Sequence, residues 1–189
     1  MAAHTLSHEK IVNTAISLVQ DQQVVTFSKL GNVLGTRSQS IYNYFKDGDE
    51  LKAAVAVKYY RDLYAKLQHS LIGLSGKAAV LKYSQVAAEF AIENFFITQY
   101  VISMPKWMFH GDQGVRDVLN DSYLLLKRLV DPLAADAEQS LVITRMIRNL
   151  ISGEVIHIGT GRFKDPLMEA SVSFEKMIEL ALINLSIDN

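Results

Sequence analysis

The chain has 189 residues, is 49% hydrophobic, carries a formal net charge of -1 and contains no cysteine. This composition allows a substantial core, and it excludes a disulfide framework, a thiolate nucleophile and a cysteine-based metal site. The near-zero net charge gives no global attraction to a polyanion. Residues 1–70 hold eight Lys or Arg against six Asp or Glu, so a small positive excess lies in the amino-terminal part.

Neither a membrane span nor a secretory signal is visible. Polar residues interrupt every apolar run before it reaches the ~18 residues that cross a bilayer. The first ten residues lack the charged and then apolar regions of a signal peptide. We therefore expect a folded, cytoplasmic protein.

Apolar residues follow helical spacing from near the amino terminus. The first predicted helix covers residues 9–20, with Ser7 as its N-cap and an apolar face formed by Ile11, Ala15, Leu18 and Val19. A short second helix runs from Phe27 to Leu34 and is capped by Thr26. Residues 47–50 then supply a turn, an N-cap and acidic first-turn residues for a long helix.

The remainder of the chain is also predicted to be helical. Apolar residues follow helical spacing over four further segments, at about residues 77–102, 115–130, 136–158 and 167–187, and glycines and prolines lie between these segments. No segment shows the regular alternation of apolar and polar residues that is typical of a β-strand. The sequence predicts an all-α protein of about nine helices.

The most informative segment runs from Gly35 to Phe45. A glycine-containing turn leads from the short second helix into another short, polar helix, which is the pattern of a helix-turn-helix. Ile41 and Phe45 are four residues apart, so both can face inward and hold this helix in place. Its polar side chains would then be exposed, as a helix that enters a DNA groove requires.

Residues 11–51 resemble the amino-terminal domain of the TetR family of bacterial transcriptional regulators. The matching positions are Ile11, Ala15, Thr26, Leu30, Gly35, Ile41, Tyr42, Tyr44, Phe45, Glu50 and Leu51. The resemblance implies a DNA-binding domain over residues 1–47 and a helical ligand-binding and dimerisation domain over residues 48–189, linked by a helix from about residue 49 to 70. It also implies a homodimer formed through the last two helices, and a repressor that a small-molecule inducer releases from a palindromic double-stranded DNA operator.

Three residues depart from the family pattern. Gly31 replaces the usual Ala, which costs the second helix ~1 kcal/mol but permits a close approach. Gly48 stands where the family usually has a Lys that contacts phosphate, so one backbone anchor is missing. Arg37 stands where a small Ser or Thr is commoner, and it can restore the lost charge from a nearby position.

Eleven residues are assigned to DNA binding by the resemblance and by their chemistry. Gln39 and Asn43 can pair with adenine edges, and Arg37 with guanine or phosphate. The hydroxyl, phenol and ammonium groups can contact phosphates, groove edges and thymine methyls. The full set is Thr26, Ser28, Lys29, Arg37, Ser38, Gln39, Ser40, Tyr42, Asn43, Tyr44 and Lys46. The alternative is an ordinary three-helix module with its tyrosines in the core.

Residues 74–189 carry no sharp motif. Their apolar and aromatic side chains could line an inducer pocket, although each could equally be plain core. The residues proposed for this pocket are Phe95, Phe96, Tyr100, Met104, Trp107, Met108, Tyr123, Met146 and His157. Contributors to the dimer contact are expected among Leu141, Met177, Leu180, Ala181 and Asn184.

No catalytic constellation is visible. Ser-x-x-Lys occurs at Ser7, Ser103 and Ser173 without supporting context, and the five histidines show no paired metal spacing. We expect a protein that is not an enzyme and that uses no cofactor or metal. The alternative function is a helical small-molecule-binding protein of the same fold that has weakened or lost DNA recognition.

Overall fold

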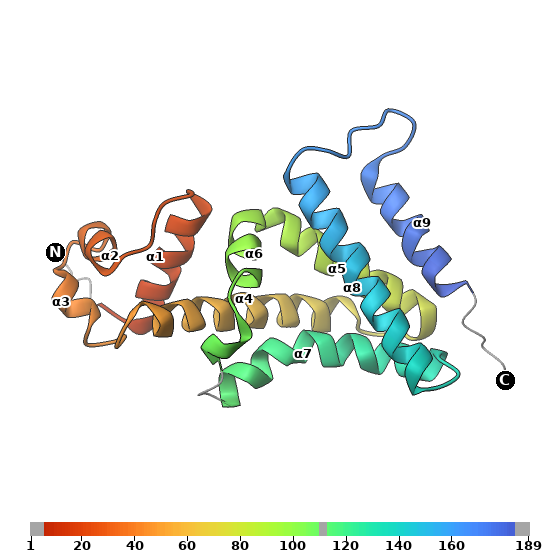
Figure 1. The fold of residues 1–189 in the computed structure, drawn as a ribbon, viewed down its shortest axis with the longest axis horizontal. Coiled ribbons are helices and arrows are strands. Elements are labelled where there is room, and N and C mark those ends of the chain that lie inside the picture. Colours follow the sequence, from red (N-terminus) through yellow and green to blue (C-terminus); the bar gives the residue numbers. More distant parts are fainter. Residues whose placement is uncertain (1–5, 110–112, 184–189) are drawn as a thin grey trace. The chain divides into compact units, whose positions relative to one another are not determined.

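The computed structural model describes residues 6–109 and 113–183, and within these ranges every regular element is a helix (Figure 1). The described part contains nine α-helices and two short 3-10 helices, which confirms the all-α prediction. They are α1 (His8–Gln20), α2 (Phe27–Val33), α3 (Ser38–Ile41), α4 (Gly48–Ser70), α5 (Gly76–Glu93), α6 (Phe95–Ile102), η1 (Lys106–Phe109), α7 (Gln113–Val130), η2 (Asp131–Leu133), α8 (Ala137–Gly159) and α9 (Ala170–Leu182). In the described ranges no helix has the length and apolar content of a membrane span.

Helix starts follow the predicted caps. The Ser7 side chain accepts a hydrogen bond from the Lys10 backbone amide, and the Thr26 side chain accepts one from the Lys29 amide. The Asp136 carboxylate likewise accepts from a first-turn amide of α8. Each of these side chains satisfies an amide that has no partner within its helix.

Two predicted boundaries are wrong. The segment expected as one helix over residues 77–102 is divided into α5 and α6, because the backbone of Asn94 leaves the helical region (φ -111°, ψ 36°). The Asn94 carbonyl instead accepts from the Thr98 amide at 2.8 Å, which begins α6. The last helix starts at Ala170, three residues later than predicted, and its predicted continuation over 184–187 lies outside the described residues.

The first of two compact units spans Met1–Arg61 and Asn94–Leu119. In this unit α1 packs against α2 and α6, and α2 packs against α3. Its fully buried side chains include Ile11, Leu30, Ile41, Phe45 and Val55. The Tyr59 hydroxyl lies 2.8 Å from the Thr98 hydroxyl and ties α4 to α6 inside this core.

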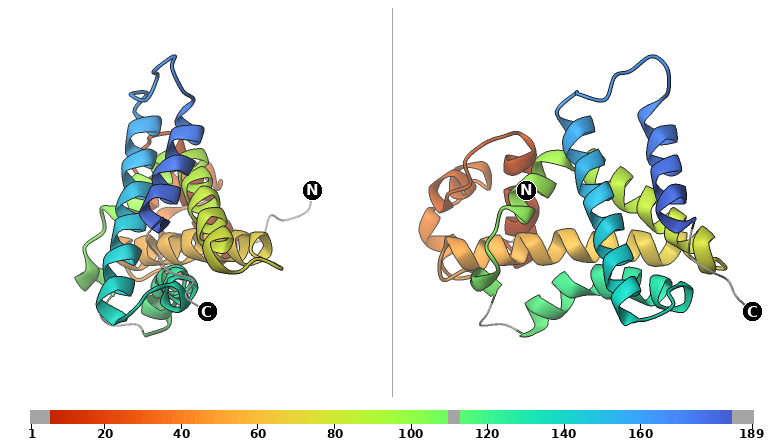
Figure 2. Two further views of the ribbon diagram at one scale, coloured as in Figure 1. Left: turned by 90° about the vertical axis from the view of Figure 1, so that its right-hand side faces the viewer. Right: turned by 45° about the vertical axis from the view of Figure 1, so that its right-hand side comes forward.

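The second unit spans Asp62–Glu93 and Asn120–Asn189. Here α5, α8 and α9 pack on one another, and Figure 2 shows α8 and α9 joined by the long connection that precedes α9. The fully buried side chains include Leu67, Val80, Leu126, Ile147 and Ile178. Because α4 contributes residues to both units, the predicted domain boundary at residue 47 stays a prediction.

Candidate nucleic-acid interface

The turn between α2 and α3 is packed tightly against α2. Gly35 has a φ of +67°, a conformation that glycine adopts without strain. The Thr36 amide donates to the Gly31 carbonyl at 2.8 Å. A Cβ atom on residue 31 would lie 3.0 Å from both the Ser38 nitrogen and the Thr36 oxygen. The close approach predicted for Gly31 is therefore present, and its neighbour is the backbone of the turn.

The helix after the turn is held by buried aromatic and aliphatic side chains. Ile41 and Phe45 are both fully buried, as their spacing predicts. The Phe45 ring packs on His8 of α1, with 4.5 Å between ring centroids. The assigned helix α3 covers only Ser38–Ile41, so the expected helical segment up to residue 45 is shorter than predicted. Residues 42–44 continue it as a turn.

The polar side chains of this segment face outward. Nine of the eleven predicted DNA-binding residues are exposed, namely Thr26, Ser28, Lys29, Arg37, Gln39, Tyr42, Asn43, Tyr44 and Lys46. Ser38 and Ser40 are half-buried, and the Ser40 hydroxyl accepts from Thr36 at 3.0 Å. The tyrosines are not core residues, so the three-helix alternative with Tyr42 and Tyr44 in its core is wrong.

Both tyrosines are nevertheless positioned by contacts. The Tyr42 ring meets Phe27 of α2 edge-on, with centroids 4.7 Å apart, while 53% of Tyr42 remains exposed. The Tyr44 hydroxyl donates to the Leu6 carbonyl at 2.7 Å. These contacts fix the orientation of the rings that flank Asn43.

Five of the predicted DNA-binding residues line one open cleft of about 510 Å³ in the first unit. These residues are Thr26, Ser28, Ser38, Tyr42 and Lys46. The cleft is completed by residues that include Gly48, Lys52 and Tyr100. Sequence reasoning missed Lys52 as part of this surface. Its position four residues after Gly48 on one helix was the available signal, because residues at that spacing share a helix face.

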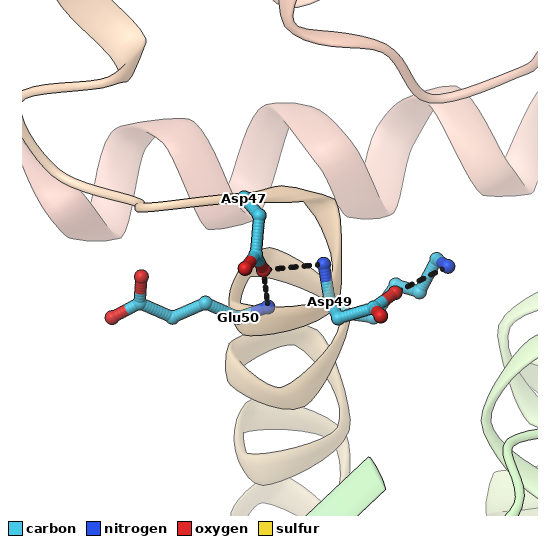
Figure 3. Close-up of polar contacts among 4 residues, drawn as sticks. Asp47, Asp49 and Glu50 are labelled. Atoms are coloured by element: carbon cyan, nitrogen blue, oxygen red, sulfur yellow. Dashed lines mark hydrogen bonds and ion pairs between the residues drawn. The ribbon is translucent and has the colours of Figure 1, made fainter.

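The first turn of α4 is arranged around Asp47 (Figure 3). One carboxylate oxygen of Asp47 accepts from the Asp49 amide at 3.0 Å and from the Glu50 amide at 2.9 Å. The turn and N-cap predicted for residues 47–50 are thus present. The side chains of Asp49 and Glu50 point to opposite sides of the helix, and the Glu50 carboxylate accepts from the Lys46 amide at 2.5 Å.

Lys52 and Asp49 form an ion pair at this end of α4, with 2.8 Å between Nζ and Oδ1. This hydrogen bond raises the pKa of Lys52, against the opposing effect of partial burial. Burial raises the pKa of Tyr100, and the positive charge of Lys52 opposes that rise. The cleft therefore holds an ammonium group close to a protonated phenol.

Comparison with known proteins gives relatives of nearly the same length. No family model matches the chain. An uncharacterized HTH-type transcriptional regulator, YobS of Bacillus subtilis, is 25% identical over 184 residues, covering 95% of this chain and 94% of YobS. A Rhodococcus protein of unknown function superimposes with a TM-score of 0.82 at 14% identity over 98% of both chains. The TetR-family regulator PfmR of Thermus thermophilus superimposes with a TM-score of 0.64 at 16% identity, covering 96% of this chain and 98% of PfmR. The chain has the TetR fold.

Within the TetR fold, the residues proposed for an inducer pocket are divided between the two units. Phe95, Phe96, Tyr100, Met104 and Met108 belong to the first unit, whereas Tyr123, Met146 and His157 belong to the second. Tyr100 lines the cleft beside α2, while His157 stacks on Phe163 with centroids 4.4 Å apart. The side chain of Trp107 lies outside the described part. The assignment of this pocket stays a prediction.

Helices α8 and α9 of the TetR fold carry exposed apolar side chains. Of the residues proposed for a dimer contact, Leu141 and Leu180 are exposed, Met177 and Ala181 are half-buried, and Asn184 lies outside the described residues. Val142, Ile156 and Val172 extend the exposed apolar set. No group of three or more His, Asp or Glu in the described residues could hold a metal ion.

Proposed function

We propose that the protein is a DNA-binding transcriptional regulator whose reading surface is the segment from Arg37 to Lys46. One observation carries this proposal. The buried side chains of Ile41 and Phe45 hold a short helical segment against the core, while the polar side chains beside them are exposed. A surface of this kind suits the major groove, where base edges are read by hydrogen bonds.

The residues divide into two roles. Arg37, Gln39 and Asn43 are exposed and carry the donor and acceptor groups that distinguish guanine and adenine edges. Thr26, Ser28, Tyr42 and Lys46 line the cleft and carry the hydroxyl and ammonium groups that contact phosphates, which fix register without reading sequence. Lys29, Ser38, Ser40 and Tyr44 complete the set of contacts.

The active form in this proposal is a homodimer through α8 and α9. Two copies related by a twofold axis present two reading segments one DNA turn apart, ~34 Å, and so select a near-palindrome. The exposed apolar residues of both helices support this arrangement. The protein acts as a repressor, and a small molecule bound among the carboxyl-terminal helices releases it by favouring a conformation that fits the operator less well.

Selection from random duplexes and from fragments of the source genome tests the proposal. Enrichment of a near-palindromic sequence, with half-sites about one turn apart, is the expected result. A population that stays random after repeated selection at low salt would contradict DNA recognition.

A second function is favoured by the composition and by Gly48. The net charge of -1 and the missing side chain at Gly48 fit a small-molecule-binding protein of the same fold that has lost its operator. The salt dependence of binding separates the two functions. The affinity of a DNA-binding protein falls steeply as the salt concentration rises, because the release of counterions from DNA becomes less favourable. Ligand binding that is independent of DNA and of salt would favour this alternative.

A further inference from the structure

Lys52, which pairs with Asp49, lines the cleft whose groups are proposed above to contact phosphate. Lys52 lines the cleft together with Lys46, so two ammonium groups belong to this surface. Hydroxyl groups of Ser, Thr and Tyr line it as well, and the one carboxylate among its lining residues, Asp47, already accepts two backbone amides at the start of α4. Ammonium and hydroxyl groups arranged in this way suit a phosphodiester, which offers several acceptor oxygens and one negative charge.

Lys52 is engaged within the chain in the absence of DNA. Its Nζ atom donates to Asp49 Oδ1 at 2.8 Å, and the two side chains are 41% and 55% exposed. An ion pair this exposed is weak, because water and salt screen it. Lys52 can therefore leave Asp49 for a stronger partner at a small cost in free energy.

Gly48 leaves room for that exchange. Apart from its chain neighbours Asp47 and Asp49 and the nearby backbone of α4, no atom lies within 4 Å of the position where a Cβ on residue 48 would stand. Lys52 is one helical turn further along α4 and shares the face of Gly48. Tyr100 of α6 lines the same cleft and adds a phenol beside the ammonium group.

We propose that Lys52 is the contact from α4 to a backbone phosphate of DNA, and that Asp49 competes with this phosphate for the Lys52 ammonium group. The inference rests on the proposed DNA binding. In the free protein Asp49 holds Lys52, and on DNA the phosphate replaces Asp49. Asp49 thereby lowers the affinity for DNA of any sequence.

A double-mutant cycle on the full-length chain tests the exchange. Binding to the selected duplex is measured over a series of salt concentrations for wild type, Lys52→Gln, Asp49→Asn and the double variant. Lys52→Gln is expected to weaken binding and to reduce the slope of log K against log salt by about 1. Asp49→Asn is expected to strengthen binding by up to about five-fold, the range of an exposed ion pair, and to have no effect in the Lys52→Gln background.

Two matched variants control for charge alone. Glu50→Gln removes a negative charge from the same helical turn, on the other side of the helix (Figure 3), and keeps an oxygen that can accept from the Lys46 amide. Lys66→Gln removes a lysine of the second unit that has a similar exposure and a similar pair, Lys66 to Glu93 at 2.9 Å. Both are expected to change affinity less than the corresponding variants at Asp49 and Lys52.

The outcomes distinguish the inference from the proposed function. If Asp49→Asn strengthens binding equally with and without Lys52, Asp49 acts by general repulsion and the inference is wrong. Unchanged affinity and salt slope in Lys52→Gln also overturn it, while the wild-type duplex binding still supports the function. If wild type selects no duplex, the proposed function fails and the inference fails with it.

Discussion

The Thr36 amide donates to the Gly31 carbonyl at 2.8 Å, so the turn of the helix-turn-helix closes directly onto the backbone of α2. A side chain at residue 31 would crowd this contact. The backbone atoms of Thr36, Arg37 and Ser38 occupy the space that a Cβ would need. The close approach of the turn to α2 is thus favoured by one glycine in the preceding helix.

Gly31→Ala is expected to destabilise the protein, although alanine is the better helix former. The added Cβ would lie 3.0 Å from backbone atoms that cannot move away as a side chain can, so overpacking should cost ~1–3 kcal/mol. Chemical denaturation measures this cost. Gly153→Ala is the control, because no atom outside its chain neighbours and the nearby backbone of α8 lies within 4 Å of its Cβ position, and it should stabilise by up to ~1 kcal/mol. Equal effects of the two changes would contradict the close contact.

Gly48→Lys is expected to strengthen DNA binding. The site is open, and a lysine there adds an ammonium group to the cleft, which should increase the salt slope by about 1. Fluorescence anisotropy with the selected duplex measures both quantities. Gly48→Ala is the control without charge, and a lysine variant indistinguishable from it would show that this end of α4 does not face phosphate.

Glu154→Gln is expected to stabilise the protein at neutral pH. Glu154 is 4% exposed, and its Oε2 atom accepts no hydrogen bond from the described residues. Burial raises the pKa of Glu154 above its ordinary value of 4.5. The folded state therefore holds a proton at pH values where the unfolded chain has released it. Protonation of Glu154 therefore favours the folded state. Its contribution to the free energy of unfolding is complete below pH 4.5, and it is lost as the pH rises through the raised pKa.

Unfolding free energies of wild type and Glu154→Gln should accordingly differ most at neutral pH, with the variant the more stable, and converge in acid. The exposed Glu89 of α5 supplies the control, since Glu89→Gln should change stability little at either pH. A difference for Glu154→Gln that does not depend on pH would show that the carboxyl group is not penalised by burial.

Leu180→Glu is expected to disrupt the proposed homodimer. Leu180 lies in α9 and is 66% exposed in the single chain, so a charge there would be buried unpaired in a dimer formed through α8 and α9. Sedimentation should show a shift from dimer to monomer. Leu167→Glu is the control, because Leu167 is 88% exposed in the connection before α9. An unchanged dimer in Leu180→Glu would place the interface elsewhere.

Local features of the fold could be predicted from the sequence because they depend on neighbouring residues. The caps Ser7 and Thr26 satisfy amides three residues away, and the spacing of Ile41 and Phe45 determines which side of the segment is buried. The break at Asn94 was missed because the apolar residues on both sides continue the helical pattern. Its cause is one backbone conformation that the pattern does not record.

The cleft could be predicted only in part. Residues from α2, α3 and the start of α4 are close in sequence, and the helix-turn-helix pattern brings them together. Tyr100 of α6 lines the same cleft, but no local pattern connects it to Lys52. Such contacts depend on tertiary packing, in this case the buried pair Tyr59 and Thr98 that joins α4 to α6.

The most direct test of the proposed reading surface is the affinity of Gln39→Ala/Asn43→Ala for the selected duplex, relative to its affinity for an unrelated duplex at the same salt concentration. Both side chains are exposed, so the variant should fold and dimerise as wild type does. The exposed Asn120 of α7 provides the control substitution, Asn120→Ala. We expect the preference for the selected duplex to fall by at least ~10-fold, the loss expected for two base contacts, while binding to the unrelated duplex stays the same. Retention of the full preference would contradict the assignment of this segment as the reading surface.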